Sequence, residues 1–229
     1  MANVSHELRT PLTSLLGFTE TLRGSARDDI EAHDRFLAIM HAQASRMSRL
    51  VADLLSLSRI DLEEHTPVEG LVELGSILRG VIDSLAPQAA AKEMALDLRT
   101  GDGLGPVSGD ADQLAQVFQN LIANVIQYGR PGTVVRIDAT PTPDGRNVAV
   151  SVEDEGDGIA RAHLPRPTER FYRVDAGRSR ALGGTGLGLA IVKHILNRHR
   201  GRMLFESELG VGTTVTVYLP ARAEDQSGK

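Results

Sequence analysis

FLAIMHAQASRMSRLVADLLSL, residues 36–57, decides the fold of the N-terminal part of this chain. Its apolar residues recur alternately at steps of four and three, which is the spacing of a heptad frame. The positions on that frame are Phe36, Met40, Gln43, Met47, Leu50, Leu54 and Leu57. Because only Gln43 is polar, the pattern predicts a long helix with a narrow apolar stripe along one side.

A second helix is predicted just before this one, and a polar turn at residues 24–29 separates the two. Its apolar stripe consists of Val4, Leu8, Leu15, Phe18 and Leu22. Two helices with such narrow stripes cannot enclose a core, so we expect an all-α helical hairpin that pairs with a second copy as a four-helix bundle. The alternative is a hairpin that packs on the rest of its own chain.

Downstream of the hairpin the pattern changes from purely helical to mixed. Helices are predicted at residues 78–91, 110–128 and 186–200, and strands at 94–98, 134–139, 148–152, 202–206 and 213–219. This mixture predicts an α+β sandwich with helices on one face of a mixed sheet. We therefore expect a helical domain at 1–62, a linker at 63–69, a second domain at 70–222 and a tail at 223–229.

Composition narrows the functional classes. The chain has 229 residues and a formal net charge of −5, which argues against a nucleic-acid partner or a polybasic membrane-binding surface. The absence of cysteine excludes disulfides, thiolate zinc sites and cysteine nucleophiles. No apolar run approaches the ~20 residues of a membrane span, so the sequence predicts a soluble intracellular fragment.

The run Ser5-His6-Glu7-Leu8-Arg9-Thr10-Pro11 holds the first candidate reactive group. His6 follows the stripe residue Val4 by two positions, so it should face solvent, where an imidazole is a workable nucleophile. Glu7 could accept its proton or orient the ring, and Thr10, one turn further, could hold a water. The alternative is a chance surface histidine, which is how we interpret the other six, including His33, His41 and His199.

Two further motifs have the chemistry of ligand sites. Asn120 and Asn124 share one helical face, and amide oxygens suit a hard cation such as Mg²⁺. In Asp154-Glu155-Gly156-Asp157-Gly158, the glycines allow a tight turn, and Asp154 could accept a hydrogen bond from an exocyclic amine. The alternative is a generic acidic turn, and the ligand spacing of an EF-hand calcium loop is missing.

A glycine-rich run, Gly183-Gly184-Thr185-Gly186-Leu187-Gly188-Leu189, opens a predicted helix. Backbone N–H groups at such a helix start form an anion site. No Gly-Lys-Ser/Thr follows, so the run is not a Walker A loop, and no strand directly precedes it, so it is not a dinucleotide fingerprint. Before it lies Glu169-Arg170-Phe171-Tyr172-Arg173, within a long loop of the kind that is usually functional.

Together these motifs resemble sensor histidine kinases of two-component systems, and the resemblance covers about residues 2–221. It implies a dimerisation and phosphoacceptor domain (HisKA) followed by an ATP-binding domain (HATPase_c) of the GHKL or Bergerat ATPase type. The run SHELRTPLTSLLGF, residues 5–18, is similar to that of phosphate-regulon sensor kinases. A gyrase-like or Hsp90-like ATPase would lack this run, and a non-enzymatic dimeric scaffold would not need four ordered motifs.

The resemblance implies Mg-ATP-dependent autophosphorylation of His6 with help from Glu7, transfer to an Asp of a response regulator, and a phosphatase reaction served by Thr10. It implies a homodimer and the cytoplasmic portion of an inner-membrane sensor. Asn124, rather than Asn120, would hold the metal, and Asp154 would bind the adenine amine. The other implied nucleotide contacts are Gln127, Tyr128, Gly156, Gly158, Ile159, Arg170, Arg173, Gly184, Thr185, Gly186, Leu187, Gly188, Thr213 and Thr214.

The chain departs from the family pattern at three places. Gln127 replaces the usual lysine, Val125 is bulkier than the usual alanine, and Pro167-Thr168 replaces an apolar residue and Phe before the lid motif. We expect ATP binding to survive in weakened form. The alternative is a degenerate kinase that acts mainly as a phosphotransfer or phosphatase module.

Overall fold

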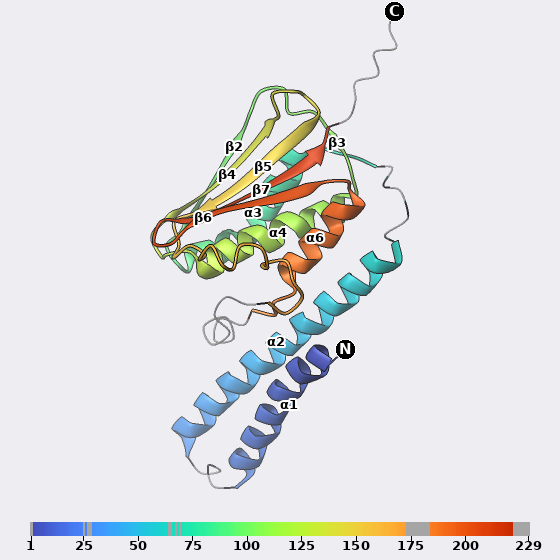
Figure 1. Cartoon of the computed structure of the whole chain (residues 1–229). Helices are drawn as coiled ribbons and strands as arrows, with labels where there is room; N and C mark the ends of the chain where they lie inside the picture. The colour runs from blue at the N-terminus through green and yellow to red at the C-terminus, as the bar shows by residue number, and fades with distance from the viewer. Residues whose placement is uncertain are drawn as a thin grey trace, which may run out of the picture.

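A hairpin of two helices forms the N-terminal part of the molecule. The computed structural model describes residues 2–24, 26, 29–63, 66, 68, 70–172 and 184–221. Helix α1 (Ala2–Arg23) and helix α2 (Ile30–Glu63) lie side by side, with the rings of Phe18 and Phe36 centred 5.2 Å apart (Figure 1). The predicted helical hairpin is therefore confirmed.

The C-terminal part is a mixed sheet with helices on one face, which confirms the predicted α+β sandwich (Figure 1). Its strand order is β2 (Ala95–Thr100), β4 (Val134–Pro141), β5 (Asn147–Asp154), β7 (Gly212–Pro220) and β6 (Arg202–Glu208). Strands β2 and β4 are parallel, and the other neighbours are antiparallel. The covering helices are α3 (Leu74–Ala90), α4 (Ala111–Tyr128) and α6 (Gly188–Arg198).

Alternation along the central strands defines the core. In β5, Val148, Val150 and Val152 are buried while the residues between them are partly exposed. Helix α4 covers this face with Leu114, Val117, Phe118, Leu121 and Ile122, all of them buried as predicted. The Asp110 side chain accepts a hydrogen bond from the N–H of Gln113 (3.0 Å) and so caps the start of α4, a contact typically worth ~1 kcal/mol.

A small second sheet was missed from the sequence. Strands β1 (Leu71–Val72) and β3 (Val107–Ser108) pair antiparallel. Two residues are too short to show an alternation, so neither strand has a periodic signal. The pair ties the segment after α2 to the start of α4, because the N–H of Gly109 also donates to the carbonyl of Gly70 (2.8 Å).

The C-terminal half of α2 packs on the second domain of the same chain. Leu50, Leu57 and Ile60 are buried in the same core cluster as residues of α4 and α6. Packing on the rest of the chain is thus observed for this half of α2, and pairing of the hairpin with a second copy stays a prediction. Large apolar side chains remain exposed on other faces of the hairpin: Leu12, Leu16, Ile30, Leu37, Val51, Leu55 and Leu62. No helix within the described ranges is long and apolar enough to cross a membrane.

Candidate functional site

A cavity of about 530 Å³ lies between α4, the glycine-rich loop, the end of β5 and α2. This volume is within the range of small-molecule sites. Among the described residues that line it are eleven proposed from the sequence: Asn120, Asn124, Gln127, Tyr128, Asp154, Gly158, Ile159, Gly184, Thr185, Gly186 and Thr213. Segments distant in sequence thus converge on one concave surface.

Helix α4 supplies the amide wall of the cavity. Asn120, Asn124 and Gln127 all line it. The end of this helix is fixed by Lys92, whose ammonium donates to the carbonyls of Ile126 and Gln127 (2.7 Å each). A cation is favourable at a helix C-terminus. Lys92 was missed from the sequence because it lies more than thirty residues away and belongs to no motif.

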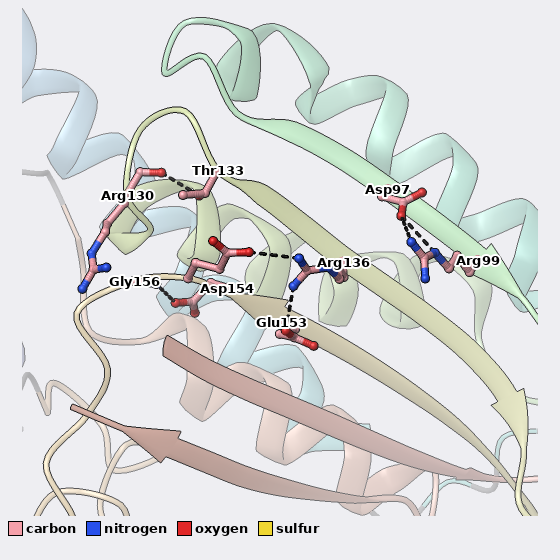
Figure 2. A network of polar contacts seen from close by, with 9 residues as sticks. Asp97, Arg99, Arg130, Thr133, Arg136, Glu153, Asp154 and Gly156 are labelled. Atoms are coloured by element: carbon pink, nitrogen blue, oxygen red, sulfur yellow. Dashed lines mark hydrogen bonds and ion pairs between the residues drawn. The ribbon is translucent and has the colours of Figure 1, made fainter. Parts of the chain in front are cut away.

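The carboxylate wall of the cavity is Asp154 at the end of β5 (Figure 2). Its side chain accepts the N–H of Gly156 (2.7 Å), while the neighbouring Glu153 pairs with Arg136 (2.9 Å). Burial raises the pKa of Asp154, and hydrogen bonds from the N–H groups of Gly156 and Thr213 oppose that rise. An acceptor carboxylate therefore faces the cavity in a partly desolvated position.

The turn after Asp154 requires glycine because it meets the loop between β6 and β7. Gly158 has a φ of +69°, and a Cβ there would lie 2.1 Å from the carbonyl oxygen of Glu208. The N–H of Ile159 donates to Ser207 Oγ (2.8 Å), which also bonds the Thr213 hydroxyl (2.8 Å). Gly156 therefore contributes through its N–H to Asp154 rather than as part of the cavity lining.

Strand alternation separates the two threonines proposed from the sequence. Thr213 and Val215 line the cavity. Thr214 lies between them, so it points to the opposite face of β7 and is not part of the cavity lining. Of the two threonines expected near the nucleotide, the structure therefore brings only Thr213 to the cavity.

The glycine-rich loop leads into α6 along the edge of the cavity. Gly186 has a φ of +74°, and Thr185 Oγ1 accepts the N–H of Leu187 (3.3 Å). Leu187 is fully buried and anchors the loop. A Cβ at Gly188 would lie 3.0 Å from Asn120 Oδ1, so glycine allows α4 and α6 to approach at this point. Leu187 and Gly188 are not part of the cavity lining.

Of the two arginines expected at the phosphates, Arg170 is not part of the cavity lining. The guanidinium of Arg170 contacts Asp61 (3.2 Å) and His194 (3.2 Å), and Arg173 lies outside the described residues. Tyr172 and Pro167 line the cavity instead. The Tyr172 hydroxyl bonds His163 Nδ1 (2.5 Å), a contact that no spacing in the sequence predicts.

The candidate reactive histidine is on the surface of α1. His6 is exposed, and the Thr10 hydroxyl donates to the His6 carbonyl (3.2 Å). Glu7 forms an ion pair with Arg46 of α2 at 2.8 Å, and Arg46 is only 8% exposed. Arg46, missed from the sequence, therefore fixes the carboxylate beside His6.

His199 is not a surface histidine, in contrast to the exposed His33 and His41. It is 5% exposed, its Nε2 accepts the N–H of Asp110 (3.0 Å), and its Nδ1–H donates to the carbonyl of Ile195 (2.8 Å). Burial lowers its pKa. The neutral ring thus joins the end of α6 to the start of α4.

Comparisons with known proteins match both halves of the chain. The family of histidine kinase-, DNA gyrase B- and HSP90-like ATPases matches residues 109–223, and the His Kinase A (phospho-acceptor) domain matches residues 1–63. The phosphate regulon sensor protein PhoR of Pseudomonas aeruginosa is 37% identical over 230 residues, covering 100% of this chain and 51% of that protein. The chain spans between about a third and three fifths of the length of the curated relatives it matches, from 36% to 58%.

Two solved structures resemble this one over nearly its whole length. The Acinetobacter baumannii histidine kinase AdeS superposes with a TM-score of 0.73 at 25% identity, covering 95% of this chain and 98% of that one. ShkA, solved at full length in complex with AMPPNP, gives a TM-score of 0.69 at 28% identity, covering 96% of this chain and 45% of that one. The arrangement of hairpin and sandwich is thus shared with other histidine kinases.

Proposed function

This chain belongs to the sensor histidine kinases, and from that premise we propose that it autophosphorylates His6 with ATP. The observation that carries the proposal is the convergence of Asn124, Asp154 and the 184–186 loop on one cavity of nucleotide size, in a chain that also exposes a histidine on α1. The class of reaction is inferred from family membership, and the role of each residue is inferred from its position and chemistry.

Each wall of the cavity suits a different part of ATP. Asp154, an acceptor next to apolar surface, would take the exocyclic amine of adenine, with Thr213 nearby. The backbone N–H groups and hydroxyl of the 184–186 loop would take the phosphates at the start of α6. An acceptor for the adenine amine on one wall and donors for the phosphates on another would fix the direction in which the nucleotide lies.

The amide oxygens of α4 fit a magnesium ion. Asn124, with Asn120 one turn earlier, presents neutral oxygen ligands, which a hard cation accepts alongside water and phosphate. When bound, Mg²⁺ would neutralise charge on the phosphates. Lys92, by holding the carbonyls of Ile126 and Gln127, keeps the end of this helix in place.

The acceptor chemistry belongs to α1. A ring nitrogen of His6 forms a bond to the γ-phosphorus of ATP while the bond from that phosphorus to the bridging oxygen breaks, and ADP leaves. Glu7 accepts the proton that the ring loses. Arg46 positions this carboxylate, because the two side chains pair at 2.8 Å.

Phosphohistidine then passes its phosphoryl group to an aspartate of a response regulator, and Thr10 holds the water of the reverse phosphatase reaction. The exposed hydroxyl of Thr10, one turn from His6, supports this role. The exposed apolar residues Leu12, Leu16 and Leu55 support a homodimer through the hairpin. From the sequence resemblance we also propose that this region is the cytoplasmic part of a larger membrane-anchored sensor.

The proposal is tested by incubating the chain with γ-labelled ATP and Mg²⁺. We expect a label that acid removes and alkali does not, as for a phosphoimidazole, and no label on the His6→Ala variant. His41→Ala is a matched control, because His41 is exposed on α2 and should leave labelling unchanged. Acid-stable label, or label that persists without His6, would refute the assignment.

A second candidate is a phosphotransfer or phosphatase module with weak use of ATP. The uncharged Gln127 lines the cavity where the family pattern has a lysine, and this favours weakened phosphate contact. The same labelling separates the two: a module would accept phosphoryl groups from a phosphorylated regulator but would not label from ATP.

A further inference from the structure

Helix α2 contributes two charged side chains to the nucleotide cavity. Arg49 and Asp53 line it together with Asn120 and Thr185. Asp53 Oδ2 accepts a hydrogen bond from Thr185 Oγ1 at 2.7 Å. A carboxylate of the hairpin thus binds the loop that the proposed function assigns to the phosphates.

Three further contacts hold α2 in this position. The Ser56 hydroxyl and the Gln116 amide of α4 bond each other (2.9 and 3.0 Å). Asp61 meets Arg170 (3.2 Å) and His194 (3.3 Å), but these groups are largely exposed and solvent screens them. Leu57, buried between the polar contacts, provides the apolar part of the interface.

Asp53 has the wrong charge for a neighbour of phosphate. It is partly desolvated, and burial raises its pKa against the opposing effects of the Thr185 hydroxyl and the Arg49 charge. An ionised carboxylate and a triphosphate repel each other, and a hydroxyl has only one proton to donate. Thr185 can therefore donate to Asp53 or to a phosphate oxygen, but not to both.

We propose that Asp53 competes with the nucleotide phosphates for Thr185, so that docking of α2 on the glycine-rich loop and nucleotide binding oppose each other. This inference rests on the proposed nucleotide site. By thermodynamic reciprocity, docking weakens nucleotide binding by the same factor by which nucleotide weakens docking. Asp53 thus sets the affinity of the site from outside the ATP-binding domain.

The first test measures binding of a non-hydrolysable ATP analogue with Mg²⁺ to the full chain by calorimetry. Asp53→Asn keeps the shape and the acceptor oxygen but removes the charge, and we expect it to bind about tenfold more tightly than the wild type, a typical coupling factor. Asp34→Asn is the control, since Asp34 is an exposed acid of α2 that does not line the cavity; its affinity should stay at the wild-type value.

The outcomes separate the two proposals. Equal binding by Asp53→Asn would overturn the competition. Weaker binding would also overturn it and would mean that Asp53 helps to hold the nucleotide or its metal. If the wild-type chain still binds the analogue, the proposed nucleotide site is supported even when the competition is overturned. Absence of binding in every variant would overturn the nucleotide site together with the competition.

The second test follows the docking of α2 directly. The chain contains no cysteine, so Ser58→Cys on α2 and Glu206→Cys on β6, both at exposed positions, label uniquely. Mixing with excess unlabelled chain would make dimers with two labelled copies rare, so that the measured distances lie within one chain. Saturating analogue should shift the distances between the labels to longer values, and the shift should need less analogue with Asp53→Asn. An unchanged distance distribution with analogue bound would overturn the proposal.

Discussion

Acidification should release the start of α4 by protonating His199. In the folded protein the neutral ring accepts the N–H of Asp110 at Nε2 and is 5% exposed. A proton on Nε2 would remove that acceptor and leave an unpaired charge among buried side chains. Asp110 is the N-cap of the helix that carries Asn120 and Asn124, so the loss would loosen one end of the proposed nucleotide site.

The direction of the His199 pKa shift sets an upper bound on the stability that is lost on acidification. Burial lowers the pKa of His199 from its ordinary value of 6.5, so as the pH falls the unfolded chain takes up this proton before the folded one. The contribution of neutral His199 to the stability of the folded protein is therefore fully present above pH 6.5 and is lost as the pH falls below 6.5. At pH 5.5 the loss has an upper bound of about 1.4 kcal/mol, or tenfold in an opening equilibrium.

Hydrogen exchange at pH 7.5 and 5.5, corrected for intrinsic exchange rates, measures this loss in the segment 107–114. We expect up to a tenfold drop in protection in the wild type. His199→Gln keeps an amide that can donate and accept but does not titrate, so its protection should not depend on this proton. An equal drop in both proteins would show that other groups cause it and would refute the reasoning.

Three substitutions test the proposed roles. Asn124→Ala should slow autophosphorylation about 100-fold or more (~2.7 kcal/mol) through loss of the metal ligand, and should leave the dimer intact; labelling at the wild-type rate would place the metal elsewhere. Gln127→Lys should strengthen analogue binding by up to about tenfold by adding a charge that solvent partly screens; calorimetry showing equal affinity would mean that residue 127 faces away from the phosphates. Thr10→Ala should keep autophosphorylation and lose most dephosphorylation of a phosphorylated regulator, whereas equal loss of both activities would make Thr10 structural.

Local signals in the sequence were sufficient for the central elements. The apolar spacing from Leu114 to Ile122 was enough to predict the helix at 110–128, because it depends only on positions within one helix. The motifs at 120–124, 154–158 and 184–186 each predicted a ligand-binding feature, and the fold brings their residues to one cavity. That these motifs contribute to one site was predicted from the family resemblance, and not from the spacing of the motifs.

Contacts between distant segments could not be predicted from spacing. Leu50 and Leu57 fit a hairpin stripe equally well whether they pack on a second copy or on the sandwich, and the structure buries both in one cluster with residues of the sandwich. The pair of Glu7 with Arg46 joins residues on different helices, and neither position has a periodic signal for it. His199 was misread because its burial comes from packing between α4 and α6, which no single helix reveals.

Arg46 and Asp53 have a common angular position on α2. Seven residues bring them to within about 20° of each other around the helix and ~10 Å apart along it. Arg46 pairs with the Glu7 carboxylate next to His6, and Asp53 accepts a hydrogen bond from Thr185 of the glycine-rich loop. A turn of α2 by about 30° about its own axis would carry side chains at its surface by ~3 Å, which is enough to break a hydrogen bond. Torsion of this single helix would therefore move the Glu7 carboxylate beside His6 and the glycine-rich loop at Thr185 together, with no change in the length or bend of the helix.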